Sequence, residues 1–210
     1  MADEASDKPD LRNRLLDAGR AAFARSGHAA ATVDDVIVEA ATSRATFYRY
    51  FKSKDDLFVE LSRECLRDLE ATIGDVKGIG AGGDPRQDLE VLLDRYRQVH
   101  ARHSGVFRAW WERNARLEPD VRNASRSVMG TLWTELEGAL EAAAVPSTVD
   151  RAVQAALLYM LIERSYYAVS SRWSRVAPER LAETLATMLH RAYFGGEVDE
   201  RAPRLRVGNT

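Results

Sequence analysis

The sequence lacks the features that would indicate a secreted protein or a membrane protein. Its 210 residues contain a single cysteine, Cys65, so no internal disulfide can form. No apolar run approaches the roughly 18 residues that a membrane-spanning helix needs. The first ten residues, MADEASDKPD, are acidic and polar, unlike a signal peptide. We therefore expect a cytoplasmic protein with no membrane span, in which Cys65 is a small buried residue.

Sequence motifs for metal binding and catalysis are also missing. There is no HExxH and no cysteine cluster, and the di-iron motif fails because Arg97, not Glu, stands three residues before His100. The glycine-rich stretch 74–84 lacks the Gly-Lys-Ser/Thr ending of a phosphate loop, and we expect a flexible link there. His28 is expected in a solvated loop, and His100 and His103 at the negative end of a helix. We expect no catalytic residue, metal or cofactor; a small all-helical enzyme or metal-binding protein is the alternative.

The overall charge gives no attraction to nucleic acid. Thirty Lys and Arg against 32 Asp and Glu leave a formal net charge of −2. Any affinity for DNA must therefore come from a local basic surface. The candidate for such a surface is the stretch of residues 32–57, TVDDVIVEAATSRATFYRYFKSKDDL. Two short helices joined by a tight turn fit inside it.

The first of these two helices begins at Thr32, where Asp35 completes a capping box. The second begins after Ser43 and runs over Arg44–Phe51. On a helical wheel, its two sides differ in chemistry. Phe47, Tyr50 and Phe51 fall on one side; Arg44, Ala45, Tyr48 and Arg49 fall on the other, with Thr46 at the boundary. An aromatic inner face with a cationic, hydrogen-bonding outer face is typical of a helix that enters the major groove.

The stretch SRATFYRYFKSKDDL resembles the DNA-binding signature of the TetR family of bacterial transcriptional repressors. The matching residues are Ala40, Ser43, Thr46, Phe47, Tyr48, Tyr50, Phe51, Ser53, Lys54, Asp55 and Leu57. The chain departs from the family pattern at Ala41 and Ala45, where Gly is usual, and at Thr42, where Val is usual. The turn at Ala41 is either closed with negative φ or strained by roughly 1 kcal/mol.

The resemblance implies which residues contact a double-stranded DNA operator. Arg44 and Thr46 are expected to read bases, because arginine can bind guanine O6 and N7 in a bidentate manner. Tyr48, Lys52 and Thr32 are expected to bind phosphates, which orients the protein without reading sequence. The full expected set is Thr32, Ser43, Arg44, Ala45, Thr46, Tyr48, Arg49 and Lys52.

Apolar periodicity and capping residues predict helices over the rest of the chain, and no strand signal appears. The expected helices are Asp10–Ser26, ended by Gly27; a long helix capped by Ser53 and Asp56 and reaching Ile73; one from Asp84-Pro85 to Arg102; Val106–Leu117; Pro119–Ala144; one from Pro146-Ser147, with a Ser147–Asp150 capping box; and one from Pro178 to Gly195. The predicted fold is all-α. A three-helix helix-turn-helix domain (10–52) joins a ligand-binding and dimerisation bundle (53–196) through the long helix, with disordered tails at 1–9 and 197–210.

Aromatic and methionine residues concentrate in the predicted bundle. Relatives in the TetR family bind an inducer between bundle helices, and Ile162–Ser165 followed by two tyrosines resembles the ethionamide-resistance repressor subgroup, whose pocket is long and apolar. The expected ligand-binding residues are Phe107, Trp110, Trp111, Asn114, Met129, Trp133, Tyr159, Met160, Glu163, Tyr166 and Tyr167. Such a lining suits a hydrophobic small-molecule effector, aromatic, acyl or steroid-like, held by one or two hydrogen bonds.

The last two predicted helices, near 148–170 and 178–194, carry apolar residues on more than one face. One face can serve the bundle, and the other would be an exposed patch in a monomer. We expect a homodimer through these helices, with Leu158 and Leu185 in an isologous four-helix interface. The predicted function is a ligand-responsive transcriptional regulator, a repressor, that binds a pseudo-palindromic operator as a dimer and leaves it when the effector binds.

Overall fold

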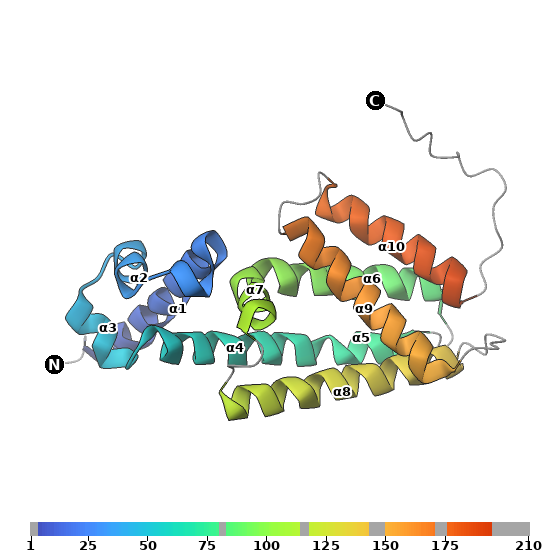
Figure 1. The fold of residues 1–210 in the computed structure, drawn as a ribbon, viewed down its shortest axis with the longest axis horizontal. Helices are drawn as coiled ribbons and strands as arrows, with labels where there is room; N and C mark the ends of the chain where they lie inside the picture. The colour runs from blue at the N-terminus through green and yellow to red at the C-terminus, as the bar shows by residue number, and fades with distance from the viewer. Residues whose placement is uncertain (1–3, 80–82, 114–117, 143–149, 171–175, 195–210) are drawn as a thin grey trace.

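The computed structural model describes residues 4–79, 83–113, 118–142, 150–170 and 176–194, without the side chains of 4–9, 112, 113 and 170. Over this described part the chain forms helices and no strand. Figure 1 shows an elongated molecule in which helices α1, α2 and α3 form one end and α4 leads from them into a helical bundle. The predicted all-α class is confirmed.

Helix α1 spans Glu4–Ala30 and begins earlier than the predicted Asp10, so the expected disorder at 1–9 is wrong from Glu4 onward. Acidic residues in a first turn interact favourably with the helix dipole and need no apolar face, so periodicity gave no signal there. Gly27 has φ 76° and ψ 155° and interrupts the helix where the sequence predicted its end. Glycine adopts such a positive φ without the clash that a Cβ would cause.

Helices α2 (Val33–Glu39) and α3 (Arg44–Tyr50) form the predicted helix-turn-helix. The capping box is complete, because the Thr32 hydroxyl accepts from the Asp35 N–H and the Asp35 carboxylate accepts from the Thr32 N–H. The Ser43 hydroxyl caps α3 by accepting a hydrogen bond from the backbone N–H of Thr46 at 3.1 Å. Both helix starts therefore lie where the sequence placed them.

The turn between α2 and α3 closes with a left-handed residue. Ala41 has φ 48°, and its N–H bonds the carbonyl of Val38 at 3.1 Å. The N–H of Thr42 bonds the carbonyl of Ile37 at 3.0 Å, which completes a Schellman motif. Of the two alternatives for this turn, the structure shows the strained one.

Helix α4 spans Lys54–Ala71 and passes from the helix-turn-helix into the bundle. Ser53 caps it by accepting from the N–H of Asp56 at 3.0 Å. The Asp56 carboxylate, however, accepts from the N–H of Lys52 at 2.9 Å and not from that of Ser53, so the predicted capping box is only half formed.

The flexible link predicted at 74–84 is wrong in its first part. A short helix, α5, spans Ile73–Gly78 directly after α4. Val76 and Ile79 are each 1% exposed. The glycine content suggested flexibility, but these two apolar side chains bury enough surface to order the segment, which packs against α6 and α8.

The bundle contains α4, α5 and five later helices. These are α6 (Pro85–Arg102), α7 (Ser104–Arg113), α8 (Pro119–Ala142), α9 (Arg151–Ser170) and α10 (Pro178–Tyr193). Helix α8 packs along α4 and α5, α9 packs on α8, and α10 packs on α6 (Figure 1). None of the described helices is long and apolar enough to cross a membrane.

The start of α9 differs from the prediction. The Asp150 carboxylate accepts from the N–H of Ala152 at 2.8 Å, so Asp150 is the residue that caps α9. The sequence gave that role to Ser147, which lies outside the described residues, as does the predicted start at Pro146. Both are acceptable caps by type, and the sequence alone did not distinguish them.

Candidate DNA-binding surface and effector cavity

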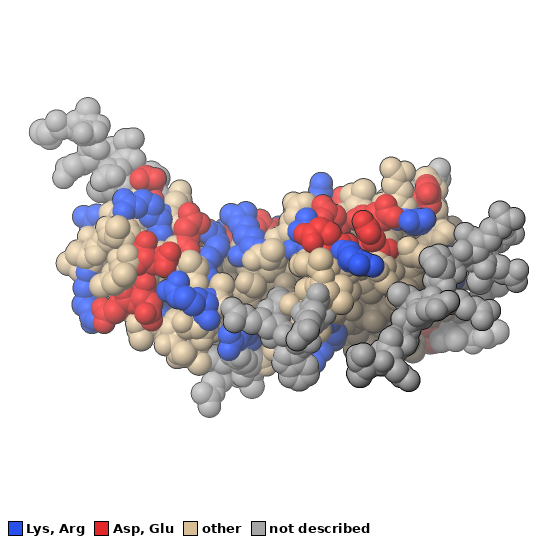
Figure 2. Space-filling view, turned by 90° about the horizontal axis from the view of Figure 1, so that it is seen from above, with Lys and Arg blue, Asp and Glu red and all other residues tan. Residues whose placement is uncertain are grey.

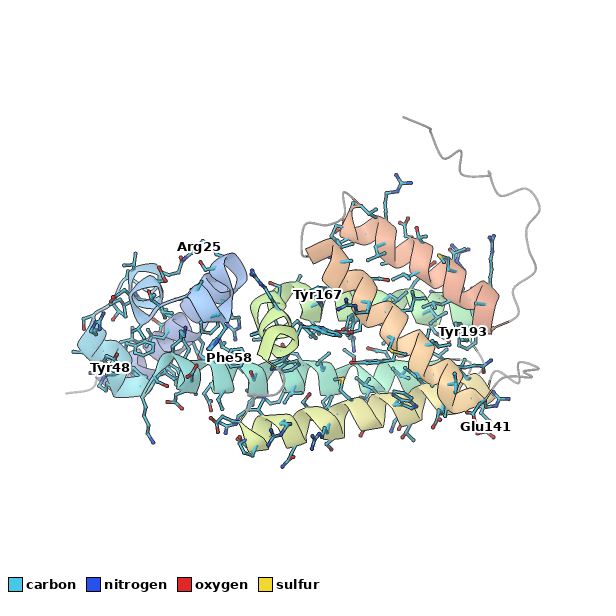
Figure 3. The ribbon with its side chains drawn as sticks, viewed as in Figure 1. Arg25, Tyr48, Phe58, Glu141, Tyr167 and Tyr193 are labelled. Carbon is cyan, nitrogen blue, oxygen red and sulfur yellow. The ribbon has the colours of Figure 1, made fainter. Side chains whose placement is uncertain are left out.

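Helix α3 is held by its aromatic side and leaves its polar side open. Phe47 is fully buried and Phe51 is 2% exposed, and both belong to the apolar core. The residues expected to contact DNA lie on the outside: Thr32, Ser43, Arg44, Ala45, Tyr48, Arg49 and Lys52 are exposed, and Thr46 is half-buried. Figure 3 shows Tyr48 at the outer end of the molecule, away from the bundle. All eight residues thus lie at one end of the molecule.

Arg44 has a partner that the sequence analysis missed. Its Nη2 donates to both carboxylate oxygens of Asp34, at 2.5 and 2.6 Å. The pKa of Arg44 is raised, first by this hydrogen bond and then by the charge of Asp34. Both side chains are more than half exposed, so the pair adds little stability and its effect is to orient the guanidinium. Spacing could not reveal it, because Asp34 belongs to the other helix.

Charges of both signs cover the face drawn in Figure 2, with Asp and Glu side chains among the Lys and Arg side chains at the helix-turn-helix end. Asp34, the partner of Arg44, is an exposed acidic residue of the helix-turn-helix. The distribution agrees with the net charge of −2. On this face, therefore, the basic side chains do not form a continuous surface of one sign.

Lys54 and His28 tie α1 to the start of α4. The Lys54 ammonium donates to the carbonyls of His28 and Ala31, each at 2.7 Å, which satisfies the end of α1. The expectation of a solvated His28 is wrong, since the ring is 1% exposed and packs between Phe23 and Phe58. Its Nε2 lies 3.0 Å from Asp55 Oδ1. A histidine after a glycine suggested a loop, but the chain folds back onto α4 here.

A cavity of about 270 Å³ lies inside the bundle, between α4, α6, α7, α8 and α9. Its lining is mostly aromatic and apolar: Leu69, Tyr96, Phe107, Trp110, Trp111, Ser125, Met129, Tyr159, Met160 and Glu163. Seven of the eleven residues expected to bind ligand line it. Trp111 and Met160 are about half exposed, at 48% and 47%, so they lie where the cavity meets solvent.

Four of the expected ligand residues do not line the cavity. Trp133 is 37% exposed on α8, one turn beyond Met129. Tyr166 is buried, and its hydroxyl donates to the carbonyl of Leu93 at 3.0 Å. Tyr167, labelled in Figure 3, packs against the Trp111 ring, with ring centroids 6.0 Å apart. Asn114 lies outside the described residues.

The sequence analysis missed three lining residues, Leu69, Tyr96 and Ser125. Leu69 follows Leu61 and Cys65 at spacing four on α4, so apolar periodicity is a signal that could have identified it. Tyr96 and Ser125 come from helices whose rotation toward the cavity depends on packing, which the sequence pattern alone does not fix.

The polar groups of the cavity are a carboxylate and hydroxyls. Glu163 is 9% exposed and accepts a hydrogen bond from Trp111 Nε1 at 2.6 Å. Burial raises the pKa of this carboxyl, with opposing contributions from the Trp111 bond and the charge of Arg164. The Tyr159 hydroxyl donates to the sulfur of Met129 at 2.8 Å, which is a weak acceptor, and burial raises the pKa of Tyr159.

Helix α7 connects the cavity to α1. Trp110 lines the cavity and also donates to the Ser62 hydroxyl at 3.3 Å. On the opposite side of α7, a Cβ added to Gly105 would lie only 2.6–2.8 Å from atoms of Phe23 and Ala24. The backbone of α7 at Gly105 therefore packs directly against the backbone of α1, with no room for a side chain between them.

Helices α9 and α10 expose an apolar stripe. Val153, Leu157 and Leu161 follow one another at spacing four on α9 and are 40–50% exposed, and Met188 on α10 is 54% exposed. Leu158 and Leu185, which the sequence analysis placed in the dimer interface, are 1% and 4% exposed inside the subunit. Apolar residues occur on more than one side of α9, so its sequence did not show which side faces inward.

The buried histidines do not form a metal site. Among the described residues, no group of three or more His, Cys, Asp or Glu side chains is placed to hold a metal ion. His100 stacks on Phe107 with ring centroids 4.6 Å apart, and burial lowers its pKa to about 4. His103 Nε2 lies 2.7 Å from Asp68 Oδ2, and burial lowers its pKa too. Both rings are buried, with His100 4% and His103 1% exposed.

Comparisons with known proteins agree with this architecture. The sequence model of "Bacterial regulatory proteins, tetR family" matches residues 15–61. The chain is 28% identical to the HTH-type transcriptional repressor KstR2 of Rhodococcus jostii over 187 residues, 88% of this chain and 90% of that protein.

Two solved structures share the fold. The TetR-family regulator PfmR of Thermus thermophilus has a TM-score of 0.68 at 19% identity, covering 85% of this chain and 97% of that one. FadR of Bacillus subtilis in complex with stearoyl-CoA has a TM-score of 0.60 at 15% identity, covering 84% and 96%. Proteins of this family bind DNA and act as dimers. The chain belongs to the TetR family of transcriptional regulators, and it is a ligand-responsive regulator with a helix-turn-helix at its N-terminus.

Proposed function

We propose that the chain is a repressor that binds a pseudo-palindromic operator as a homodimer and releases it when a hydrophobic molecule enters the bundle cavity. The observation that carries the proposal is the open polar side of α3. Its aromatic side is fixed in the core, whereas Arg44, Ala45 and Tyr48 are exposed to solvent, with Arg44 paired to the exposed Asp34. Residues 10–52 would form the DNA-binding domain and 53–196 the ligand-binding and dimerisation domain.

Each residue in the DNA-binding set has a proposed role. Arg44 and Thr46, at the start of α3, would read base edges in the major groove. Thr32, Tyr48 and Lys52 would bind phosphates and set the register. The remaining members, Ser43, Ala45 and Arg49, would lie against the backbone and groove wall.

Dimerisation would bury the apolar stripe on α9 and α10. The stripe, Val153, Leu157, Leu161 and Met188, is too apolar to remain in water without cost. Pairing with the same helices of a second copy gives an isologous four-helix contact. The two α3 helices would then meet successive turns of the major groove.

Effector release would act through α7. A ligand against Phe107 and Trp110 pushes on one side of this helix, and Gly105 on the other side touches α1. The ligand favours the subunit arrangement that it binds more tightly, which is one with an unsuitable half-site separation. Phe107, Trp110, Trp111, Met129, Tyr159, Met160 and Glu163 would contact it. The apolar lining suits a largely hydrophobic molecule, and stearoyl-CoA is bound by a protein of the same fold.

The proposal is tested by operator-binding titrations at several salt concentrations with a duplex selected for wild-type binding. Arg44→Ala should weaken binding by about 1–3 kcal/mol and relax specificity at one base pair per half-site. Lys52→Ala should weaken binding to all sequences alike and lower the salt slope by about one unit. Arg86→Ala, on the exposed start of α6, is the control and should change neither. Wild-type affinity and salt dependence in both test variants would contradict the proposal.

A further inference from the structure

The effector cavity has an unusual balance of charge. Five of its ten lining residues are aromatic: Tyr96, Phe107, Trp110, Trp111 and Tyr159. Glu163 is the one ionisable acid in the lining, and no Lys, Arg or His side chain of the described residues belongs to it. A carboxylate enclosed by aromatic faces is chemically suited to a positive charge, because ring faces and a carboxylate both attract cations.

The described residues leave Glu163 only partly satisfied. Of its two oxygens, Oε1 accepts the bond from Trp111 Nε1, and no ion pair is formed with Glu163 within the described chain. Arg164 is the nearest cation in sequence, but its guanidinium stacks 4.4 Å over the Trp111 ring and does not line the cavity. The carboxylate thus keeps acceptor capacity toward the cavity that a ligand donor can use.

Burial makes the charged form of this carboxylate costly. Desolvation is the largest influence on Glu163 and raises its pKa, although the hydrogen bond from Trp111 and the charge of Arg164 act in the opposite direction. An ammonium group within hydrogen-bond distance would favour the ionised form and offset the desolvation. A ligand carboxylate or phosphate at the same place would add a second negative charge in a low-dielectric site and be repelled.

We propose that the effector is a hydrophobic amine, whose ammonium group binds Glu163 and lies against the surrounding aromatic rings while its apolar part fills the cavity. The inference rests on the proposed role of the cavity as the effector site. It replaces the broad class of aromatic, acyl or steroid-like molecules with one that carries a hydrogen-bond-donating positive charge. The volume of about 270 Å³ is large enough for a small amine.

The test uses three probes that share one skeleton: 4-phenylbutylamine, 4-phenylbutan-1-ol and 4-phenylbutanoate. Binding to the full-length protein is followed by tryptophan fluorescence, because Trp110 and Trp111 line the cavity. A charge-assisted hydrogen bond predicts that the amine binds about tenfold or more tightly than the alcohol, and that the carboxylate binds most weakly. Equal or tighter binding of the alcohol or the carboxylate, or no saturable binding of the amine, would overturn the proposal.

Glu163→Gln is the matched variant, since an amide oxygen can still accept from Trp111 Nε1 while the charge is lost. It should weaken amine binding about tenfold or more and leave the alcohol nearly unchanged. Glu141→Gln removes an exposed charge at the far end of α8 and should alter neither probe (Figure 3). Unchanged amine affinity in Glu163→Gln would also overturn the proposal.

Operator release is measured separately with the same probes, which distinguishes this inference from the proposed function. An amine that binds through Glu163 without releasing DNA would leave the ligand class standing and contradict the effector role. A carboxylate that binds tightly and releases DNA would contradict the ligand class and support the effector role.

Discussion

The same substitution at two neighbouring alanines is expected to change stability in opposite directions. Ala41 and Ala45 occupy the two positions at which TetR-like signatures usually have glycine, and both side chains are exposed. Ala41 has φ 48° in the turn, whereas Ala45 lies inside α3. Replacing either residue by glycine removes one exposed methyl group and leaves no cavity, so the backbone decides the outcome.

The backbone geometry gives the magnitudes. Ala41→Gly relieves a left-handed conformation that costs an L-residue about 1–2 kcal/mol, and it adds about 0.4–1 kcal/mol of unfolded-state entropy. The net result should be an increase of about 0.5–1 kcal/mol in the free energy of unfolding. Ala45→Gly relieves no backbone strain, so its free energy of unfolding should fall by about 0.5–1 kcal/mol.

The assay is urea denaturation followed by circular dichroism, with the two variants and the wild type compared at equal protein concentration. Operator affinity should stay within about twofold for Ala41→Gly, because the Schellman hydrogen bonds are made by backbone atoms that glycine keeps. Equal destabilisation by both variants would show that Ala41 does not have the left-handed conformation, and the reasoning about this turn would be wrong.

Three further outcomes follow from the bundle. Leu157→Glu, in the exposed apolar stripe, should give folded monomers in sedimentation velocity and weaken operator binding. Leu158→Glu should instead unfold the subunit, because Leu158 is buried. A stable wild-type monomer at micromolar concentration would contradict the proposed dimer interface. Burial lowers the pKa of His100 to about 4 in the folded chain, so the unfolded chain, with a pKa of about 6.5, takes up this proton at a higher pH. The folded state therefore loses stability as the pH falls below about 6.5. Between pH 7 and 5, the free energy of unfolding should therefore fall by about 2 kcal/mol less in His100→Gln than in the wild type, as measured by denaturation. The same pH dependence of the unfolding free energy in both proteins would refute this. Gly105→Ala should lower the melting temperature and reduce the effect of ligand on operator binding, while Gly130→Ala, with nothing near its added Cβ, should not lower it; equal behaviour of the two would argue against coupling through α7.

The sequence allowed the helices and caps of the helix-turn-helix to be predicted almost completely, because their signals are local. Caps at Thr32 and Ser43 and the two-sided wheel of α3 depend on residues within one turn of each other. Asp34 was missed because its contact with Arg44 joins two helices. The ordered segment at α5 was missed because the burial of two apolar side chains outweighed a glycine-rich composition.

The sequence predicted the aromatic and apolar character of the cavity, but not which individual residues line it. Trp133 and Met129 are four residues apart on α8, yet only Met129 lines the cavity, while Trp133 is 37% exposed. Leu157 and Leu158 are adjacent on a helix with apolar residues on more than one side, and only packing shows which of them is buried. Such choices depend on contacts between helices far apart in sequence.

The central claim, that α3 reads DNA as part of a symmetric dimer, is tested most directly by selecting duplexes from a random-sequence library with the full-length protein. The account predicts enrichment of an inverted repeat whose half-sites lie about one helical turn, or a multiple of it, apart. Repeating the selection with Arg44→Ala should lose preference at one base pair in each half-site. Enrichment of no sequence, or of one that lacks two-fold symmetry and is unaffected by Arg44→Ala, would contradict the account.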